Sequence, residues 1–182
     1  MHLSRDAIVS TALELLTRYG LADVTMRRVA TNLGVAPGAL YWHVANKQSL
    51  IAAMTSEILS PVTGETTTEL VSSLHGELTR WRDGAEVAIA GAAFPETSAS
   101  SDLEKLFTSA LKREAPGASP EDSGVAARAL IHYVLGATFM EQSREQLSGA
   151  SPSAAPSAPN AVSGVDTLVR SAELMVAGLR TL

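Results

Sequence analysis

The chain has 182 residues, a formal net charge of −5 and no cysteine, so neither a disulfide framework nor a thiolate metal site can form. Its length is enough to bury a core without covalent staples, as one domain or as a small domain joined to a larger one. The sequence shows no secretory signal, and no stretch reaches the roughly 18 uncharged apolar residues of a membrane span, so we expect a cytoplasmic protein that does not contact membranes.

Four helices are predicted in the first third of the chain, over residues 4–19, 26–33, 37–43 and 46–60. Ser4, Thr25 and Asn46 are suitable caps for the first, second and fourth helices. Gly34 supplies the turn after the second helix, because glycine tolerates a positive φ. Pro37 fits the first turn of the third helix, where its missing N–H costs nothing.

The rest of the chain is also predicted to be helical. Helical spacing of apolar residues predicts helices over about residues 70–82, 103–111, 119–147 and 165–179, with a short apolar segment at 84–91. Residues 148–164 are uncharged and rich in Ser, Ala and Pro, which predicts a flexible loop. Because no region alternates as strands do, we predict an all-α fold, with a three-helix head at residues 1–46 and a helical body at 47–182.

The charge is unevenly distributed between these two parts. Residues 1–47 carry five basic and three acidic side chains, a net charge of +2, whereas the remaining residues carry −7. A mildly basic head on an acidic body is typical of a DNA-binding domain attached to a domain that does not touch DNA.

The second and third helices of the head have the spacing of a helix-turn-helix motif. In that motif the second helix of the pair enters the major groove and presents its first residues to the bases. Here those residues are small, so the backbone can approach the DNA closely, and Ala39 could touch a thymine methyl group. Tyr41, His43 and Lys47 offer groups for phosphate oxygens. The same spacing also occurs in ordinary helix pairs of α-helical domains, which is the alternative from spacing alone.

Residues 4–59 resemble the DNA-binding domain of the TetR (tetracycline-repressor) family. The resemblance rests on the Leu-Gly-Val turn at 33–35, on Gly-Ala-Leu-Tyr-Trp-His-Val at 38–44 and on Asn-Lys-x-x-Leu at 46–50. Shorter matches follow in the body, at Arg-Trp-Arg-Asp-Gly-Ala-x-Val and at His-Tyr-x-Leu-Gly-Ala, and they favour the tetracycline-repressor branch. The resemblance implies that these residues face a double-stranded DNA operator: Thr25, Arg27, Pro37, Gly38, Ala39, Tyr41, Trp42, His43 and Lys47.

The resemblance also implies a homodimer. The nearly uncharged helix at 126–140 and the apolar face of the last helix, at 165–179, could pack with their symmetry mates as a four-helix interface. The alternative is that both helices fill the core of the monomer. A two-fold dimer would present its recognition helices roughly 34–36 Å apart, as a palindromic operator requires.

By the same resemblance, the body senses a small molecule. A mostly apolar cavity with a few polar groups suits a drug-like ligand. The alternative for each apolar candidate is packing in the core, and His132 is as compatible with a satisfied core histidine as with a ligand contact. The candidate ligand-binding residues are His75, Trp81, Arg82, Phe94, Phe107, Leu111, His132, Leu135, Thr138, Phe139 and Glu141.

One departure from the family pattern bears on the ligand. Ala88 stands where the tetracycline repressor has a metal-coordinating histidine. We therefore expect no metal and no cofactor, and an apolar or aromatic effector instead of a magnesium-bound tetracycline. Isolated histidines and the absence of phosphate-binding or nucleophile motifs argue against an enzyme. The remaining alternative is a dimeric DNA-binding regulator without a small-molecule effector.

Overall fold

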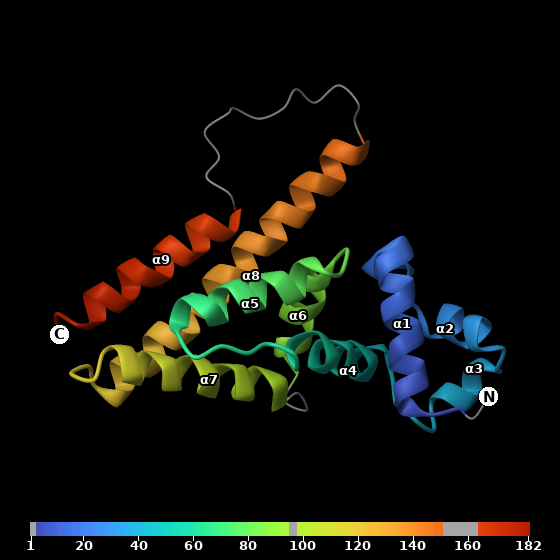
Figure 1. Cartoon of the computed structure of the whole chain (residues 1–182). Helices are drawn as coiled ribbons and strands as arrows, with labels where there is room; N and C mark the ends of the chain where they lie inside the picture. Colours follow the sequence, from blue (N-terminus) through green and yellow to red (C-terminus); the bar gives the residue numbers. More distant parts are fainter. Residues whose placement is uncertain (1–2, 95–97, 151–163) are drawn as a thin grey trace.

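The computed structural model describes residues 3–94, 98–150 and 164–182, with only the backbone described at 149 and 150. Every regular element within these ranges is a helix, as predicted (Figure 1). The elements are α1 (Arg5–Tyr19), the 3₁₀ helix η1 (Leu21–Asp23), α2 (Met26–Leu33), α3 (Pro37–Leu40), α4 (Lys47–Leu59), α5 (Thr67–Thr79), α6 (Gly84–Ala92), α7 (Ser98–Glu114), α8 (Pro120–Ala150) and α9 (Gly164–Leu179).

The predicted helix caps of the head are confirmed by their hydrogen bonds. Ser4 accepts a bond from the N–H of Ala7 at 3.1 Å, and Asn46 accepts one from Ser49 at 2.8 Å. Each bond satisfies a backbone donor that the first turn of a helix leaves free. Gly34 adopts the left-handed conformation, with φ 68°, at the turn between α2 and α3.

Several predicted boundaries are wrong. Helix α5 begins three residues earlier than the apolar spacing indicated, because Thr66 and Glu69 form a capping box inside the threonine-rich stretch. Helix α3 ends at Leu40, and residues 41–43 form a turn instead of its last residues. The short apolar segment predicted at residues 84–91, by contrast, coincides with a helix, α6.

The loop predicted at residues 148–164 also begins too early. Helix α8 continues to Ala150, and α9 already begins at Gly164. The rest of that prediction, residues 151–163, lies outside the described residues. Hydropathy did not locate the end of α8 because its last turns carry mostly small and polar residues, which any loop also tolerates.

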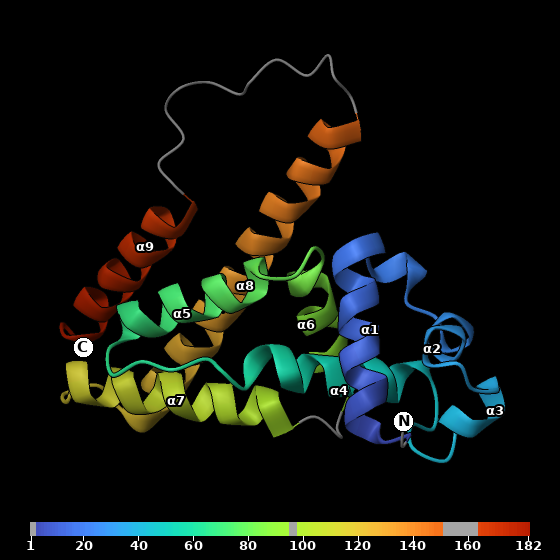
Figure 2. The ribbon, with the colours of Figure 1, turned by 45° about the vertical axis from the view of Figure 1, so that its right-hand side comes forward.

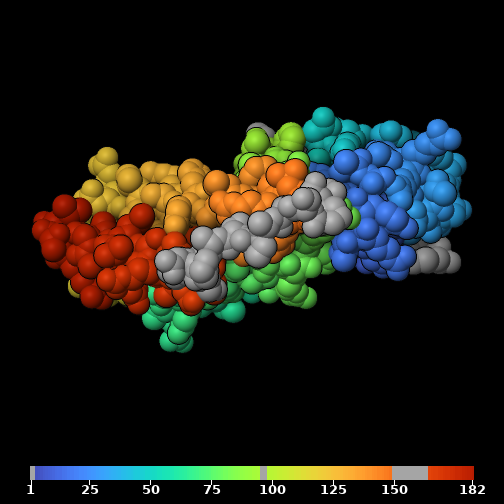
Figure 3. Space-filling view, turned by 90° about the horizontal axis from the view of Figure 1, so that it is seen from above, coloured from blue at the N-terminus to red at the C-terminus, as the bar shows by residue number. Residues whose placement is uncertain are grey.

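The body is arranged around α8, which packs against α5, α6, α7 and α9. The head of α1 to α3 lies at one end of an elongated molecule and α9 at the other, as the view from above shows (Figure 3). The buried apolar side chains form one continuous cluster that extends from Ile8 in α1 to Leu179 in α9. The head and the body therefore share a single core.

Helix α4 connects the two parts, because it packs against α1 on one side and against α5, α6 and α7 on the other (Figures 1 and 2). It packs most extensively against α6. The buried Thr55 hydroxyl donates to the carbonyl oxygen of Val87 at 2.9 Å. A Cβ atom on Gly91 would lie 1.9 Å from the same hydroxyl oxygen, so the two helices can cross here only with glycine at that position.

We expect Gly91→Ala to lower the free energy of unfolding by about 1–3 kcal/mol, because the added methyl group overpacks the buried crossing of α4 and α6. Urea denaturation at a fixed protein concentration measures the change. The matched control is Gly76→Ala in α5, where a Cβ meets nothing within 4 Å. The control should stabilise the protein by about 0.5–1 kcal/mol, as is usual when alanine replaces glycine within a helix. Equal effects of the two changes would contradict the close crossing.

Candidate DNA-binding surface and body cavities

The predicted DNA-facing residues lie in two segments, residues 25–27 and 37–47, in the head and at the first residue of α4. All of them are exposed except Ala39 and Lys47, which are half-buried. Trp42 is the most exposed aromatic side chain of the described residues, at 90%. The indole therefore packs against little of the core and remains available to another molecule.

Neighbouring arginines at the start of α2 differ in their surroundings. Arg28 forms an ion pair with Asp23, and its guanidinium lies 4.0 Å from the centre of the Tyr19 ring. These contacts hold Arg28 inside the head. Arg27 is exposed, and no side-chain hydrogen bond or ion pair involves its guanidinium within the described part of the chain. Of the two arginines, Arg27 is therefore the one available to DNA.

The larger cavity of the body, of about 640 Å³, lies between α8 and α9. Its wall combines apolar atoms with a histidine, an arginine and a carboxylate. A carboxylate oxygen of Glu141 on this wall lies at hydrogen-bond distance, 2.9 Å, from Nε2 of His75. The lining residues are His132, Tyr133, Gly136, Ala137, Met140, Glu141, Arg144, Gly164, Thr167 and Leu168.

A smaller cavity, of about 150 Å³, lies among α4, α6, α7 and α8. His132 and Leu135 line it, so His132 reaches both cavities. Ala88 also lines it, at the position where the resemblance places a metal-binding histidine. The hydroxyl oxygen of Ser100, on the same wall, is buried without a hydrogen-bond partner among the described residues.

The structure brings only some of the predicted ligand-binding residues to these two cavities. His132, Leu135 and Glu141 line them, and His75 contacts Glu141. The others lie elsewhere: Phe107, Leu111 and Thr138 are fully buried in the core, Phe139 and Arg82 are exposed, and Phe94 is half-buried just beyond α6. Burial of Phe107 and Leu111 fits the packing alternative, and a ligand contact at these positions stays a prediction.

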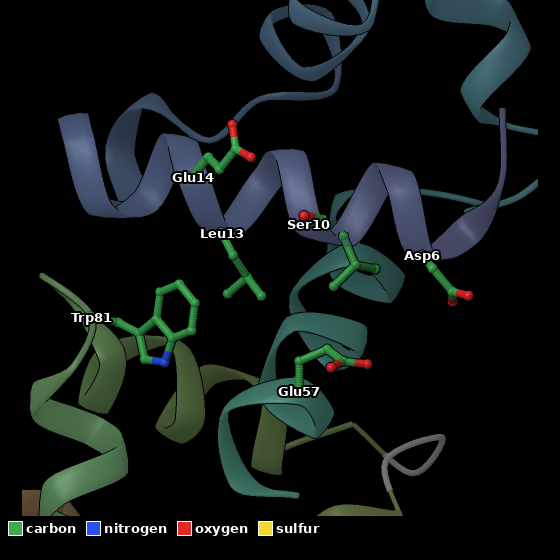
Figure 4. A pocket seen from close by; sticks show the side chains of 7 residues that line it. Asp6, Ser10, Leu13, Glu14, Glu57 and Trp81 are labelled. Atoms are coloured by element: carbon green, nitrogen blue, oxygen red, sulfur yellow. The ribbon is translucent and has the colours of Figure 1, made fainter. Parts of the chain in front are cut away.

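Trp81 lies in a third place, a cleft of about 410 Å³ between α1 and α4. Its indole ring projects toward Leu13 of α1, and Glu57 approaches from α4 (Figure 4). Arg82 follows it and lies beside Gly20 at the end of α1. These two side chains therefore contact the head, and neither lines the larger or the smaller body cavity.

A buried carboxylate joins the head to the body near this cleft. Asp83 is 7% exposed and accepts a hydrogen bond from the N–H of Leu21, in η1, at 2.6 Å. Its other oxygen accepts a bond from the side chain of Gln146 in α8. The neighbouring Gln142 donates to the carbonyl oxygens of Leu78 and Trp81, at 3.1 and 2.8 Å. The end of α8, the start of α6 and the head thus meet at one polar junction.

Known proteins share the sequence pattern of the head and the helical architecture of the whole chain. The family model described as bacterial regulatory proteins, tetR family, matches residues 8–54. The tetracycline repressor protein class D of Escherichia coli is 32% identical over 151 residues, which cover 77% of this chain and 67% of that relative. The chain belongs to the tetR family.

Solved structures of the family share the whole architecture. BioQ with its natural double-stranded DNA operator matches with a TM-score of 0.81 and 32% identity, over 100% of both chains. A TetR variant from Acinetobacter baumannii AYE in complex with minocycline matches with a TM-score of 0.76 and 25% identity, over 99% of this chain and 98% of that one. The chain is thus a transcriptional regulator of a DNA-binding family, and not an enzyme.

None of the helices among the described residues is both long and apolar enough to cross a membrane. Within the same ranges, no group of three or more His, Cys, Asp or Glu side chains is placed to hold a metal ion.

Several lining residues of the larger cavity were missed from the sequence. The sequence does contain a pattern that predicts them. Gly136, Met140 and Arg144 follow His132 at intervals of four residues, so they lie on the same side of α8 as this histidine. No comparable sequence pattern predicts the residues of the polar junction. Asp83, Gln142 and Gln146 read as ordinary polar residues in sequence, and only the packing of α6 against α8 buries the first two.

Proposed function

We propose that this protein is a homodimeric transcriptional repressor that binds a palindromic DNA operator and is released from it by an apolar or aromatic small molecule. The observation that carries the proposal is the combination, in one chain, of an exposed head surface with cavities in the body that share His132. The operator-bound state of BioQ and the minocycline-bound state of the TetR variant support the two partners by analogy.

On DNA, the head has two kinds of contact. Tyr41, Trp42, His43 and Lys47 fix the position of the protein on the phosphate backbone. The N-terminal residues of α3, Pro37, Gly38 and Ala39, lie against base edges together with Thr25 and Arg27 from the start of α2. This division is supported by exposure and by the freedom of the Arg27 guanidinium.

The dimer forms along α8 and α9. The apolar face named from the sequence is largely used inside the monomer, since Leu168, Ala172 and Val176 are buried. A different stripe remains exposed on α8, where Tyr133, Met140 and Leu147 recur every seven residues and are 39%, 55% and 72% exposed. A spacing of seven keeps them on one side of the helix, where a second helix can pack. The larger cavity opens beside this stripe and would be closed by the partner.

Release from DNA follows from linkage. The ligand and the operator bind better to different arrangements of the two heads, so each weakens the other by the same factor. To shift the ratio of the two arrangements from 1:99 to 99:1, the ligand must bind the favoured arrangement ~5.5 kcal/mol more tightly than the other. Helix α6 is our candidate for the moving element, because it borders the smaller cavity, bonds to Thr55 of α4 and begins at the Asp83 junction.

Lys47→Ala should weaken binding to all duplex DNA about equally and reduce the slope of log K against log salt by about 0.9, the value for one lost phosphate contact. Fluorescence anisotropy with labelled duplex over a range of salt concentrations measures this slope. Lys112→Ala, at the exposed end of α7, removes the same charge from the body and is the control. An unchanged slope for Lys47→Ala would exclude a phosphate contact at that position.

Sedimentation at micromolar concentration should show a dimer. Met140→Glu should weaken the dimer at least about a hundredfold, because a two-fold interface buries the new charge twice without a partner. The control is Leu106→Glu, which places the same charge at an apolar residue of α7 that is 41% exposed. A monomeric wild-type protein, or a dimer insensitive to Met140→Glu, would contradict the proposed interface.

A thermal-shift screen of apolar and aromatic compounds, with DNA release as the second readout, tests the effector. For a compound that passes both, His132→Leu should weaken binding about tenfold, through loss of one polar contact, and leave DNA affinity without the compound unchanged. His43→Leu should weaken DNA binding and leave binding of the compound unchanged. If compounds bind the body but none releases DNA, the regulator without a small-molecule effector becomes the better description.

A further inference from the structure

Arg28, the third residue of α2, is held on several sides, in contrast to the neighbouring Arg27. Its backbone N–H donates to the hydroxyl oxygen of Thr25 at 3.1 Å. Its guanidinium pairs with the carboxylate of Asp23 and lies 4.0 Å from the centre of the Tyr19 ring. These three side chains, of Tyr19, Asp23 and Arg28, form an arginine clasp that joins the end of α1, η1 and the start of α2. Both predicted DNA-facing residues of α2 adjoin this clasp, because one bonds to Arg28 and the other precedes it.

Helix α2 depends on such contacts for its orientation. It has eight residues, and a helix of this length has little stability of its own in water. Its buried side chains are those of Val29 and Ala30, with Met26 and Leu33 packed against the core beside them. Apolar contacts of this kind are not directional, whereas an ion pair combined with a ring contact has a defined geometry. The clasp therefore restrains the direction in which the first turn of α2 points.

The acidic side of the clasp belongs to a segment that is itself fixed. Asp23 ends η1, and the N–H of Leu21 at the start of η1 donates to Asp83 of the body at 2.6 Å. The next residue, Val24, is fully buried, and its N–H donates to the carbonyl oxygen of Leu21 at 3.1 Å. Because η1 is anchored on both sides, Asp23 holds Arg28 in place and does not follow its movements.

We propose that Arg28 is a positioning residue for DNA recognition, and that Asp23 and Tyr19 affect DNA binding only through it. The clasp orients the first turn of α2 so that the guanidinium of Arg27 meets the bases. The side chains of Arg28 and Asp23 are 34% and 48% exposed, and exposed ion pairs contribute little to folding stability. The consequence of the clasp is therefore orientation more than stability. The role of Arg28 rests on the proposed contact between Arg27 and DNA.

The experiment measures discrimination between two duplexes with the full chain. One duplex is an operator isolated from a randomised library by repeated selection with the wild-type protein, and the other has an unrelated sequence. Asp23→Ala should lower the ratio of the two affinities about fivefold to tenfold, since a misplaced arginine loses much of one base contact. Simple electrostatics gives a different result, because loss of a negative charge from the head should tighten binding to both duplexes equally.

Asp6→Ala is the matched control, because it removes the same charge from the exposed first turn of α1 and leaves the clasp intact. It should leave the ratio unchanged. An Asp23→Ala protein with the wild-type ratio, or with the same result as Asp6→Ala, would refute the positioning role. Tyr19→Leu removes only the ring contact and should lower the ratio about twofold to fivefold. Thermal unfolding of each variant checks the fold, and Tyr19→Leu decides the test if Asp23→Ala does not fold.

Arg28→Gln separates positioning from a direct contact. If Arg28 acts only on the orientation of α2, the slope of log K against log salt on the unrelated duplex stays at the wild-type value while the ratio falls. A slope reduced by about 0.9 would show that Arg28 itself contacts a phosphate, and the proposal would be wrong.

A double-mutant cycle tests the route through Arg27. Arg27→Ala should lower the ratio about tenfold or more, and adding Asp23→Ala to it should change the ratio by less than about twofold. Full additivity would contradict the proposed route. If Arg27→Ala itself has no effect, the proposed base contact of Arg27 fails and the role of Arg28 fails with it. If Arg27→Ala lowers the ratio and Asp23→Ala does not, only the role of Arg28 fails.

Discussion

The crossing of α4 and α6 is the contact on which the rest of the molecule depends. A buried hydroxyl of Thr55 bonds to α6, and Gly91 lets the helices approach until no side chain fits between them. Because α4 also packs against α1, a displacement of α6 moves α4, and α4 transmits the movement to the head. The position of the residues proposed to face DNA is therefore set by packing in the body and not by the head alone.

A second connection runs outside this crossing. Asp83 accepts hydrogen bonds from η1 of the head and from Gln146 of α8, and Gln142 holds the start of α6 by its bond to Ala85 N–H at 3.1 Å. These bonds are buried or partly buried, where an unmade hydrogen bond is expensive, so they favour one geometry. The head is thus attached to the body through the packed helix α4 and through this polar junction. The cleft at Trp81 lies beside both, between α1 and α4.

Much of the head could be predicted from the sequence. Caps, turns and helical spacing are local, and Ser4, Gly34 and Asn46 act within three or four residues of themselves. The exposed aromatic turn after α3 was also visible, because Tyr41 and Trp42 stand in a segment too short to bury them. The surroundings of the predicted ligand-binding residues were harder to foresee, since an apolar residue at helical spacing looks the same whether it faces a cavity or the core. Phe107 and Leu111 proved to be core, and His132 proved to face both cavities.

The sequence by itself determined the helical class, the family and the segment of the head that resembles known DNA-binding domains, because each depends on local pattern or on motif. Only the tertiary structure decided which residues meet across the chain. It moved Trp81 and Arg82 from the expected sensor to the side of α1, joined Asp83 to Leu21, and gathered Asp6, Glu14 and Glu57 around one cleft. Such contacts join residues separated by tens of positions, and they arise from how α1, α4, α6 and α8 pack, which no local spacing encodes.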